Sequence, residues 1–201
     1  MKKHGHFIAV VGPSGVGKDS VIAGLLLAMP QLQKVKRTIT RNPELGGEDF
    51  DPASESSFQT SVVNSEFCLH WKAHGLSYGI PSHVLISARN GQHAIANLSR
   101  SVLTQAAHLF SKFLVVQLTA TPQTLAKRLQ SRGRESEEEI AARFARSTYP
   151  MPSGLEIIRV SNDGLLQSTL DEIVGLLERK LDAGAQLGDT FPVSDITDNQ
   201  I

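Results

Sequence analysis

The sequence predicts an α/β protein in which helices cover both faces of a mostly parallel central sheet. Residues 6–12 form a short apolar run that is continuous rather than alternating, as in a buried strand of a parallel sheet. Further along the chain, strand-like and helix-like segments alternate. Residues 34–91 interrupt this alternation, because they are polar and rich in Gly, Pro and Ser. We therefore expect one domain over 1–181 with an inserted lobe at about 34–91, followed by a loosely ordered tail at 182–201.

The composition is typical of a globular protein that does not bind polyanions. Of the 201 residues, 40% are hydrophobic and 20% are charged, and Lys+Arg equals Asp+Glu at 20 each. This balance gives no support to nucleic-acid or membrane-surface binding. The single cysteine, Cys68, fits a reducing compartment, and the apolar stretch near the N-terminus is too short for a signal peptide. We expect a cytoplasmic location.

The predicted elements follow in order along the chain. After the first strand, apolar residues recur at helical spacing from Val21 until Pro30 stops the helix. Pro122 suits the first turn of a later helix. The expected strands are 6–12, 91–98, 112–120 and 155–162, the expected helices are 122–132 and 164–181, and the charged stretch at about 132–147 is expected to be a mobile surface element.

A glycine-rich loop, GPSGVGKDS, lies between the first strand and the first helix. Strand, loop and helix in this order bring main-chain N–H groups and a helix N-terminus together on a phosphate. Lys18 would reach the β- and γ-phosphates of a nucleotide. The alternative is an ordinary Gly-rich turn. The predicted nucleotide-binding residues are Gly12, Pro13, Ser14, Gly15, Val16, Gly17, Lys18, Asp19 and Ser20.

Asp19 stands where a standard phosphate loop has the Ser or Thr that holds Mg²⁺. One interpretation is that Asp19 holds Mg²⁺ directly or through water. The other is that Asp19 is a first-turn acid favoured by the helix dipole, and that Ser20 supplies the hydroxyl one position later. Asp19 and Ser20 are therefore the candidate metal ligands.

Four further segments resemble the guanylate kinase family: KRTITRNPELGGEDF, HGLSYGIP, KRLQSRGRESEEEIAARF and VSNDG. The resemblance covers about residues 6–181. It implies the three-layer sandwich of a P-loop kinase, with a parallel central sheet, an acceptor-binding lobe, an Arg-rich lid, and use of ATP and Mg²⁺. It also implies that Arg41 and Tyr78 bind the acceptor's phosphate and that Asn162 lies on the adenine side. By the same resemblance the residues acting on the transferred group are Lys18, Arg128, Arg132 and Arg143.

The chain departs from guanylate kinases where that family reads guanine. Leu69 replaces a base-reading Glu, and Arg37 replaces a guanine-contacting Ser. In place of the family's Asp-x-Asp the chain has Asn97 and Arg100. The chain thus lacks the carboxylate that would recognise a base and has additional arginines at other positions. This change favours a smaller, more highly charged phosphate ester as the acceptor.

With these departures the sequence resembles the ribose 1,5-bisphosphate phosphokinase family, enzymes of bacterial phosphonate use. The resemblance implies transfer of the ATP γ-phosphoryl group to ribose 1,5-bisphosphate, giving 5-phosphoribosyl 1-diphosphate and ADP. The accepting oxygen belongs to an ionised phosphate, so positioning and charge neutralisation suffice without a general base. The candidate acceptor-binding residues are Arg37, Arg41, Lys72, Tyr78 and Arg100.

Three alternatives have weaker support. A true guanylate kinase is disfavoured by Leu69, and a non-catalytic guanylate-kinase-like binding domain is disfavoured by Lys18 and the lid arginines. His70 and His74 could suggest a metal pair, but their segment reads as a loop and offers no third acidic ligand at the required spacing. We expect a small sugar phosphate as partner, with no nucleic acid and no membrane. A homodimer is compatible with the sequence, which does not specify the oligomeric state.

Overall fold

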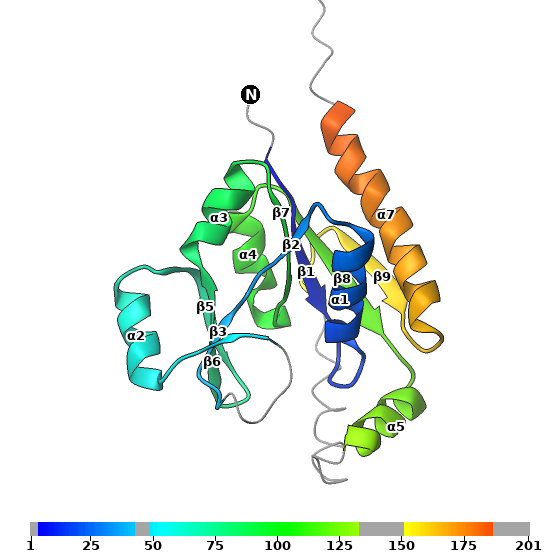
Figure 1. Ribbon diagram of the computed structural model, residues 1–201, viewed down its shortest axis with the longest axis horizontal. Coiled ribbons are helices and arrows are strands. Elements are labelled where there is room, and N and C mark those ends of the chain that lie inside the picture. Colours follow the sequence, from blue (N-terminus) through cyan, green and yellow to red (C-terminus); the bar gives the residue numbers. More distant parts are fainter. Residues whose placement is uncertain (1–3, 43–48, 133–150, 187–201) are drawn as a thin grey trace, which may run out of the picture.

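The computed structural model describes residues 4–42, 49–132 and 151–186, and its centre is a five-stranded sheet in the order β2-β7-β1-β8-β9 (Figure 1). All its neighbouring strands pair in parallel. The predicted parallel sheet is therefore confirmed. Its strands are β1 Phe7–Val11, β2 Leu32–Lys34, β7 His93–Asn97, β8 Phe113–Thr119 and β9 Ile157–Ser161.

Strand β1 is buried on both faces, as its continuous apolar run predicts. Ile8 and Val10 join an apolar cluster with α1 (Lys18–Ala28) and α7 (Leu166–Gln186). Phe7, Ala9 and Val11 join a second cluster with α3 (Ser82–Arg89) and α4 (Leu103–Leu109). Helices thus cover both faces of the sheet (Figure 1). Alternate side chains of one strand hold the three layers together.

A second sheet is built from residues inside the inserted segment, in the order β4-β3-β6-β5. Its longest pairing is an antiparallel hairpin in which residues 74 and 75 form the turn, with φ of 54° at His74 and 73° at Gly75. The expected loop around His70 is wrong, because His70 lies on a strand of this hairpin. The elements here are β3 Thr38–Ile39, β4 Asp51–Pro52, α2 Glu55–Val63, β5 Phe67–Ala73 and β6 Leu76–Pro81.

The two sheets share one apolar cluster. Leu69 and Ile80 of the hairpin are both fully buried and belong to the same cluster as Phe7 and Val115 of the central sheet. Trp71 also packs there and stacks on Tyr78, with ring centroids 5.3 Å apart. The hairpin is therefore packed rigidly against the central sheet.

At the carboxyl end of the chain, helix α7 extends to Gln186, beyond Leu181, where we expected the tail to begin. Helix α5 (Pro122–Arg132) begins and ends where predicted, and the rest of the expected lid lies outside the described residues. Helices α2, α3 and α4 and the short 3-10 helix η2 (Arg100–Val102) are not predicted from the sequence. In the described part of the chain, no helix has the length and apolar character needed to span a bilayer.

Candidate active site

The loop between β1 and α1 has the backbone of a phosphate cradle. Gly15 and Gly17 have φ of 81° and 92°, in the left-handed region that favours glycine. A Cβ on Gly17 would meet the Asn162 side-chain nitrogen at 2.7 Å, so a larger residue would displace that amide. Helix α1 begins at Lys18, and its first-turn N–H groups and dipole favour an anion at this end.

Lys18 is folded onto its own loop. Its ammonium donates hydrogen bonds to the carbonyl oxygens of Gly12 at 2.9 Å and Pro13 at 3.0 Å. The positive charge thus lies within the cradle, where the phosphates of a nucleotide would bind.

The carbonyl oxygen of Val16 ties the loop to two other elements. It accepts a hydrogen bond from Asn162 Nδ2 at 2.7 Å and another from Arg128 Nη1 at 3.3 Å. Asn162 is buried, and its Oδ1 accepts from the Thr169 hydroxyl at 2.9 Å. Arg128 comes from α5, at the same end of the molecule as the loop (Figure 1). Asn162, predicted to bind nucleotide, thus already has protein partners at both ends of its amide.

Asp163 fixes the neighbouring loop. Its carboxylate accepts hydrogen bonds from the Thr121 main-chain N–H at 2.8 Å, the Thr121 hydroxyl at 2.9 Å and the Ser161 hydroxyl at 2.9 Å. The bond from the Thr121 main chain, with those from the nearby hydroxyls, holds the pKa of Asp163 far below its usual range. The segments that follow β8 and β9 are joined at this carboxylate.

Beside the second sheet, a cavity of about 550 Å³ opens at Arg41. The Arg41 guanidinium lies 4.7 Å from the centre of the Phe50 ring, within the range of a cation–π contact. Lys72, a candidate acceptor ligand, instead pairs with Glu55 at 3.2 Å, and both side chains are exposed. The cavity is lined by Thr40, Arg41, Asn42, Pro52, Ala53, Ser54, Glu55 and Gly75.

Arg37 is buried, whereas a side chain that binds a phosphate at the surface would be exposed. Only 8% of it is exposed, its Nη1 donates to the Asn97 main-chain oxygen at 2.9 Å, and its guanidinium is 5.3 Å from the centre of the Tyr78 ring. Tyr78 stacks on Trp71 on its strand neighbour. Arg37 therefore joins the end of β7 to the hairpin.

Asp19 and Asn97 are in direct contact. The Asn97 side-chain N–H donates to Asp19 Oδ1 at 2.6 Å, although the two residues are 78 positions apart. From the sequence, Asn97 is interpreted only as the replacement of a carboxylate, and this contact is not predicted. The signal that could have found it is the strand order. If β7 is expected to pair in parallel with β1, the end of β7 lies beside the phosphate loop that follows β1.

Of the other residues singled out from the sequence, the structure describes Arg100 and Leu69 fully, Arg132 in part and Arg143 not at all. Arg100 is part-buried at the start of η2, and burial lowers its pKa from the ordinary value. Leu69 is fully buried in the shared apolar cluster. Arg132 ends α5, but its side chain lies outside the described residues, as does all of Arg143.

The residues at the start of α1 fit Mg²⁺. Asp19 and Ser20 are both exposed, and Mg²⁺ is usually held by one or two carboxylates together with waters and substrate phosphates. A cluster of protein ligands is not required by that chemistry. Asp19 and Ser20 are the side chains here that would hold the ion.

Comparison with known proteins places this geometry in a family. The guanylate kinase family model matches residues 4–183. The ribose 1,5-bisphosphate phosphokinase PhnN of Ruegeria sp. is 46% identical over 87% of this chain and 92% of its own length. The chain belongs to the ribose 1,5-bisphosphate phosphokinase family, within the guanylate kinase-like kinases.

Two further matches agree. In this family, the enzyme of Brucella melitensis is 41% identical over 80% of this chain and 85% of its own. A crystal structure of guanylate kinase from Anaplasma phagocytophilum superposes with a TM-score of 0.65, covering 90% of this chain and 88% of that one, at 18% identity. The second match shows the fold alone, and it confirms the predicted α/β architecture.

Proposed function

We propose that this protein transfers the γ-phosphoryl group of ATP to ribose 1,5-bisphosphate, giving 5-phosphoribosyl 1-diphosphate and ADP. Kinship over nearly the whole length of the Ruegeria enzyme, which carries that substrate in its name, supports the proposal. The structural observation that supports this proposal most directly is the burial of Leu69. This residue, at the place of the guanine-reading Glu, is fully buried in an apolar cluster and offers no hydrogen bond to a base.

In this proposal the chain works by positioning charges. The main-chain N–H groups of the loop and Lys18 bind the β- and γ-phosphates of ATP, and Arg128 approaches the same loop from α5. Mg²⁺, when bound at Asp19 and Ser20, supplies charge neutralisation. The acceptor phosphate is already ionised, so no side chain has to remove a proton.

The acceptor is held by the second sheet and its neighbours. Arg41, which lines the cavity, and Tyr78, whose ring lies against Arg37, bind a phosphate of the sugar. Arg37 and Arg100 add positive charge at the end of β7. By the family resemblance Arg132 and Arg143 would act on the transferred group, but the side chain of Arg132 and all of Arg143 lie outside the described residues. Lys72 contributes less, because Glu55 already neutralises it at the surface. The setting is phosphonate breakdown in the cytoplasm.

An assay that compares the two acceptors tests the proposal. The purified protein is given ATP and Mg²⁺ with ribose 1,5-bisphosphate or GMP, and ADP release is measured together with the phosphorylated product. We expect turnover with the sugar bisphosphate and little with GMP, and loss of turnover in Lys18→Ala. Preference for GMP would identify a guanylate kinase instead, and no turnover with either acceptor would favour a binding domain.

A further inference from the structure

Asn97 touches both halves of the proposed active site. Its side-chain N–H donates to Asp19 Oδ1 of α1 at 2.6 Å. Its main-chain oxygen accepts from Arg37 Nη1, in the segment between β2 and β3, at 2.9 Å. Asn97 is the last residue of β7 and only 8% exposed. The nucleotide side and the acceptor side are therefore joined to one buried residue.

The other end of the Asn97 amide shows that stability alone does not explain an asparagine here. Its Oδ1 is buried and has no hydrogen-bond partner within the described part of the chain. An unpaired buried polar atom costs about 1–3 kcal/mol. Its chain neighbours Ile95, Ala96 and Leu98 are all buried and apolar, so Asn97 is the exception in this stretch of buried residues. Asp19 is exposed and does not need this partner for its solvation.

A small cavity of about 100 Å³ adjoins the contact between Asp19 and Asn97. Asp19, Lys34, Arg37 and Asn97 line it together with apolar side chains. In the described part of the chain the second carboxylate oxygen of Asp19 has no protein partner. Asp19 is thus fixed by one oxygen and keeps the other for a ligand.

We propose that Asn97 is a positioning residue for phosphoryl transfer. Its side chain holds the Asp19 carboxylate in one orientation beside the phosphate loop, while its main-chain oxygen holds Arg37 on the acceptor side. This inference rests on the proposed function and adds a residue to it. A carboxylate on an exposed first turn can otherwise rotate, and a displacement of about 1 Å can cost up to roughly 100-fold in rate.

A double-mutant cycle tests whether Asn97 acts through Asp19. The variants are Asn97→Leu, Asp19→Ala and the double variant, and the control is Asn90→Leu, an exposed asparagine at the end of α3. The measurements are kcat/KM, the Kd of a non-hydrolysable ATP analogue with Mg²⁺, and Tm.

We expect Asn97→Leu to lower kcat/KM roughly tenfold while Tm is unchanged or rises, because the unpaired oxygen is removed. In the Asp19→Ala background the same change should cost less than about twofold in kcat/KM or Kd. Effects that multiply independently, or a fall in Tm that accounts for the lost activity, would overturn the proposal.

Asn97→Asp supplies a second readout that a purely structural role would not move. This variant keeps the size of the side chain but replaces the amide donor with a carboxylate, which repels Asp19 instead of donating to it. We expect Asn97→Asp to weaken binding of the ATP analogue at least as much as Asn97→Leu does, and to have less than about a twofold effect in the Asp19→Ala background. An equal effect of Asn97→Asp with and without the Asp19 carboxylate would overturn the contact.

These readouts separate this inference from the proposed function. Binding of the ATP analogue does not involve the acceptor, so the cycle can be read even if the acceptor proves to be GMP. Turnover of ribose 1,5-bisphosphate with no coupling between residues 19 and 97 would refute the positioning role and leave the proposed function intact.

Discussion

At Asn162 both ends of the side-chain amide are used inside the protein. The nitrogen holds the Val16 carbonyl, and the oxygen accepts from Thr169, which is 3% exposed. The position opposite the amide must be glycine, because a Cβ on Gly17 would meet it. The conformation of the phosphate loop therefore depends on a residue that follows it by more than a hundred positions.

Replacing Asn162 with Ala tests this dependence. The change removes two buried hydrogen bonds, from Asn162 to Val16 and from Thr169 to Asn162, while the Thr169 hydroxyl keeps the Ser161 main-chain oxygen at 3.3 Å. We therefore expect a loss of about 1–3 kcal/mol in the free energy of unfolding. We also expect weaker binding of an ATP analogue, because the loop loses one of its two ties at Val16. Urea denaturation and calorimetry measure the two effects, with the exposed Gln123→Ala as control. Unchanged affinity would mean that Arg128 alone holds the loop.

At the scale of elements, the turn of the hairpin β5–β6 reaches the cavity beside Arg41. Its strands are joined by residues 74 and 75, both with positive φ, as a two-residue turn of this twist requires. Gly75 is one of the residues that line the cavity. The backbone conformation of the turn therefore also shapes the cavity.

Gly75→Ala should destabilise the protein by about 1–2 kcal/mol, because alanine is strained at positive φ. No atom lies within 4 Å of the added Cβ, so the cost comes from the backbone and not from a clash. Gly164→Ala is the matched control, since its site is also open and its φ is not in the positive range. Equal unfolding free energies for the two variants, measured in urea, would contradict the turn strain.

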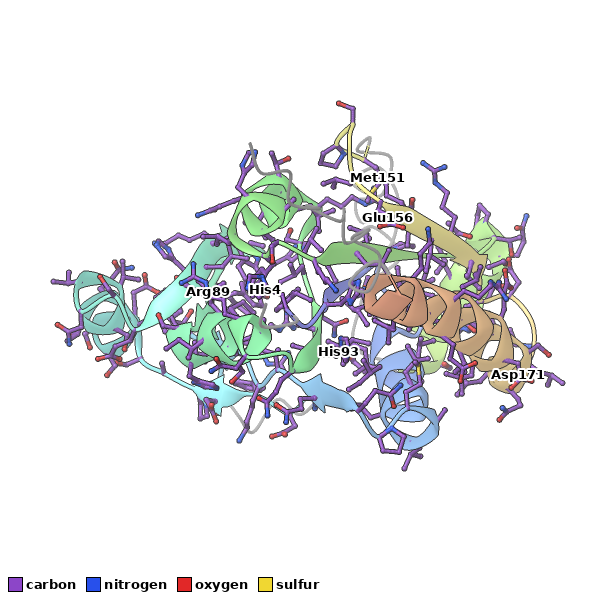
Figure 2. All side chains as sticks on the ribbon, turned by 90° about the horizontal axis from the view of Figure 1, so that it is seen from above. His4, Arg89, His93, Met151, Glu156 and Asp171 are labelled. Atoms are coloured by element: carbon purple, nitrogen blue, oxygen red, sulfur yellow. The ribbon has the colours of Figure 1, made fainter. Side chains whose placement is uncertain are left out.

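At the scale of the whole molecule, a histidine pair lies at the amino ends of the strands, away from the phosphate loop. Figure 2 views this end and labels His4 and His93 near its centre. The His6 main-chain N–H donates to His93 Nδ1 at 2.9 Å, and the two rings stack 5.4 Å apart. Burial, followed by the nearby charge of Lys112, lowers the pKa of His6 to about 4, and burial also lowers the pKa of His93.

These histidines make stability depend on pH. Between pH 6.5 and about 4 the unfolded chain binds a proton at His6 that the folded protein does not. The free energy of unfolding should therefore fall as the pH is lowered through that window. His6→Gln should flatten this slope, and the exposed His83→Gln should leave it unchanged. Tm measured across the window checks this, and an equal slope in His6→Gln would assign the acid sensitivity to other groups.

Much of the fold could be predicted because its signals are local. A continuous apolar run marked β1, helical spacing marked α1, and Pro122 marked the start of α5. The hairpin was harder, because residues 34–91 are polar overall and only one face of strand β5 is buried. Helix α4 was missed because it has only seven residues, too few for a clear helical period.

The sequence by itself determined the order of strand, phosphate loop and helix, and the replacement of the base-reading carboxylate by Leu69. These follow from neighbouring residues and from a motif. Only the tertiary structure decided that Asp19 contacts Asn97, that Arg37 is buried against that residue's main chain, and that Arg128 holds Val16. Those pairs are 78, 60 and 112 positions apart, and parallel strand pairing together with packing of the layers brings them together.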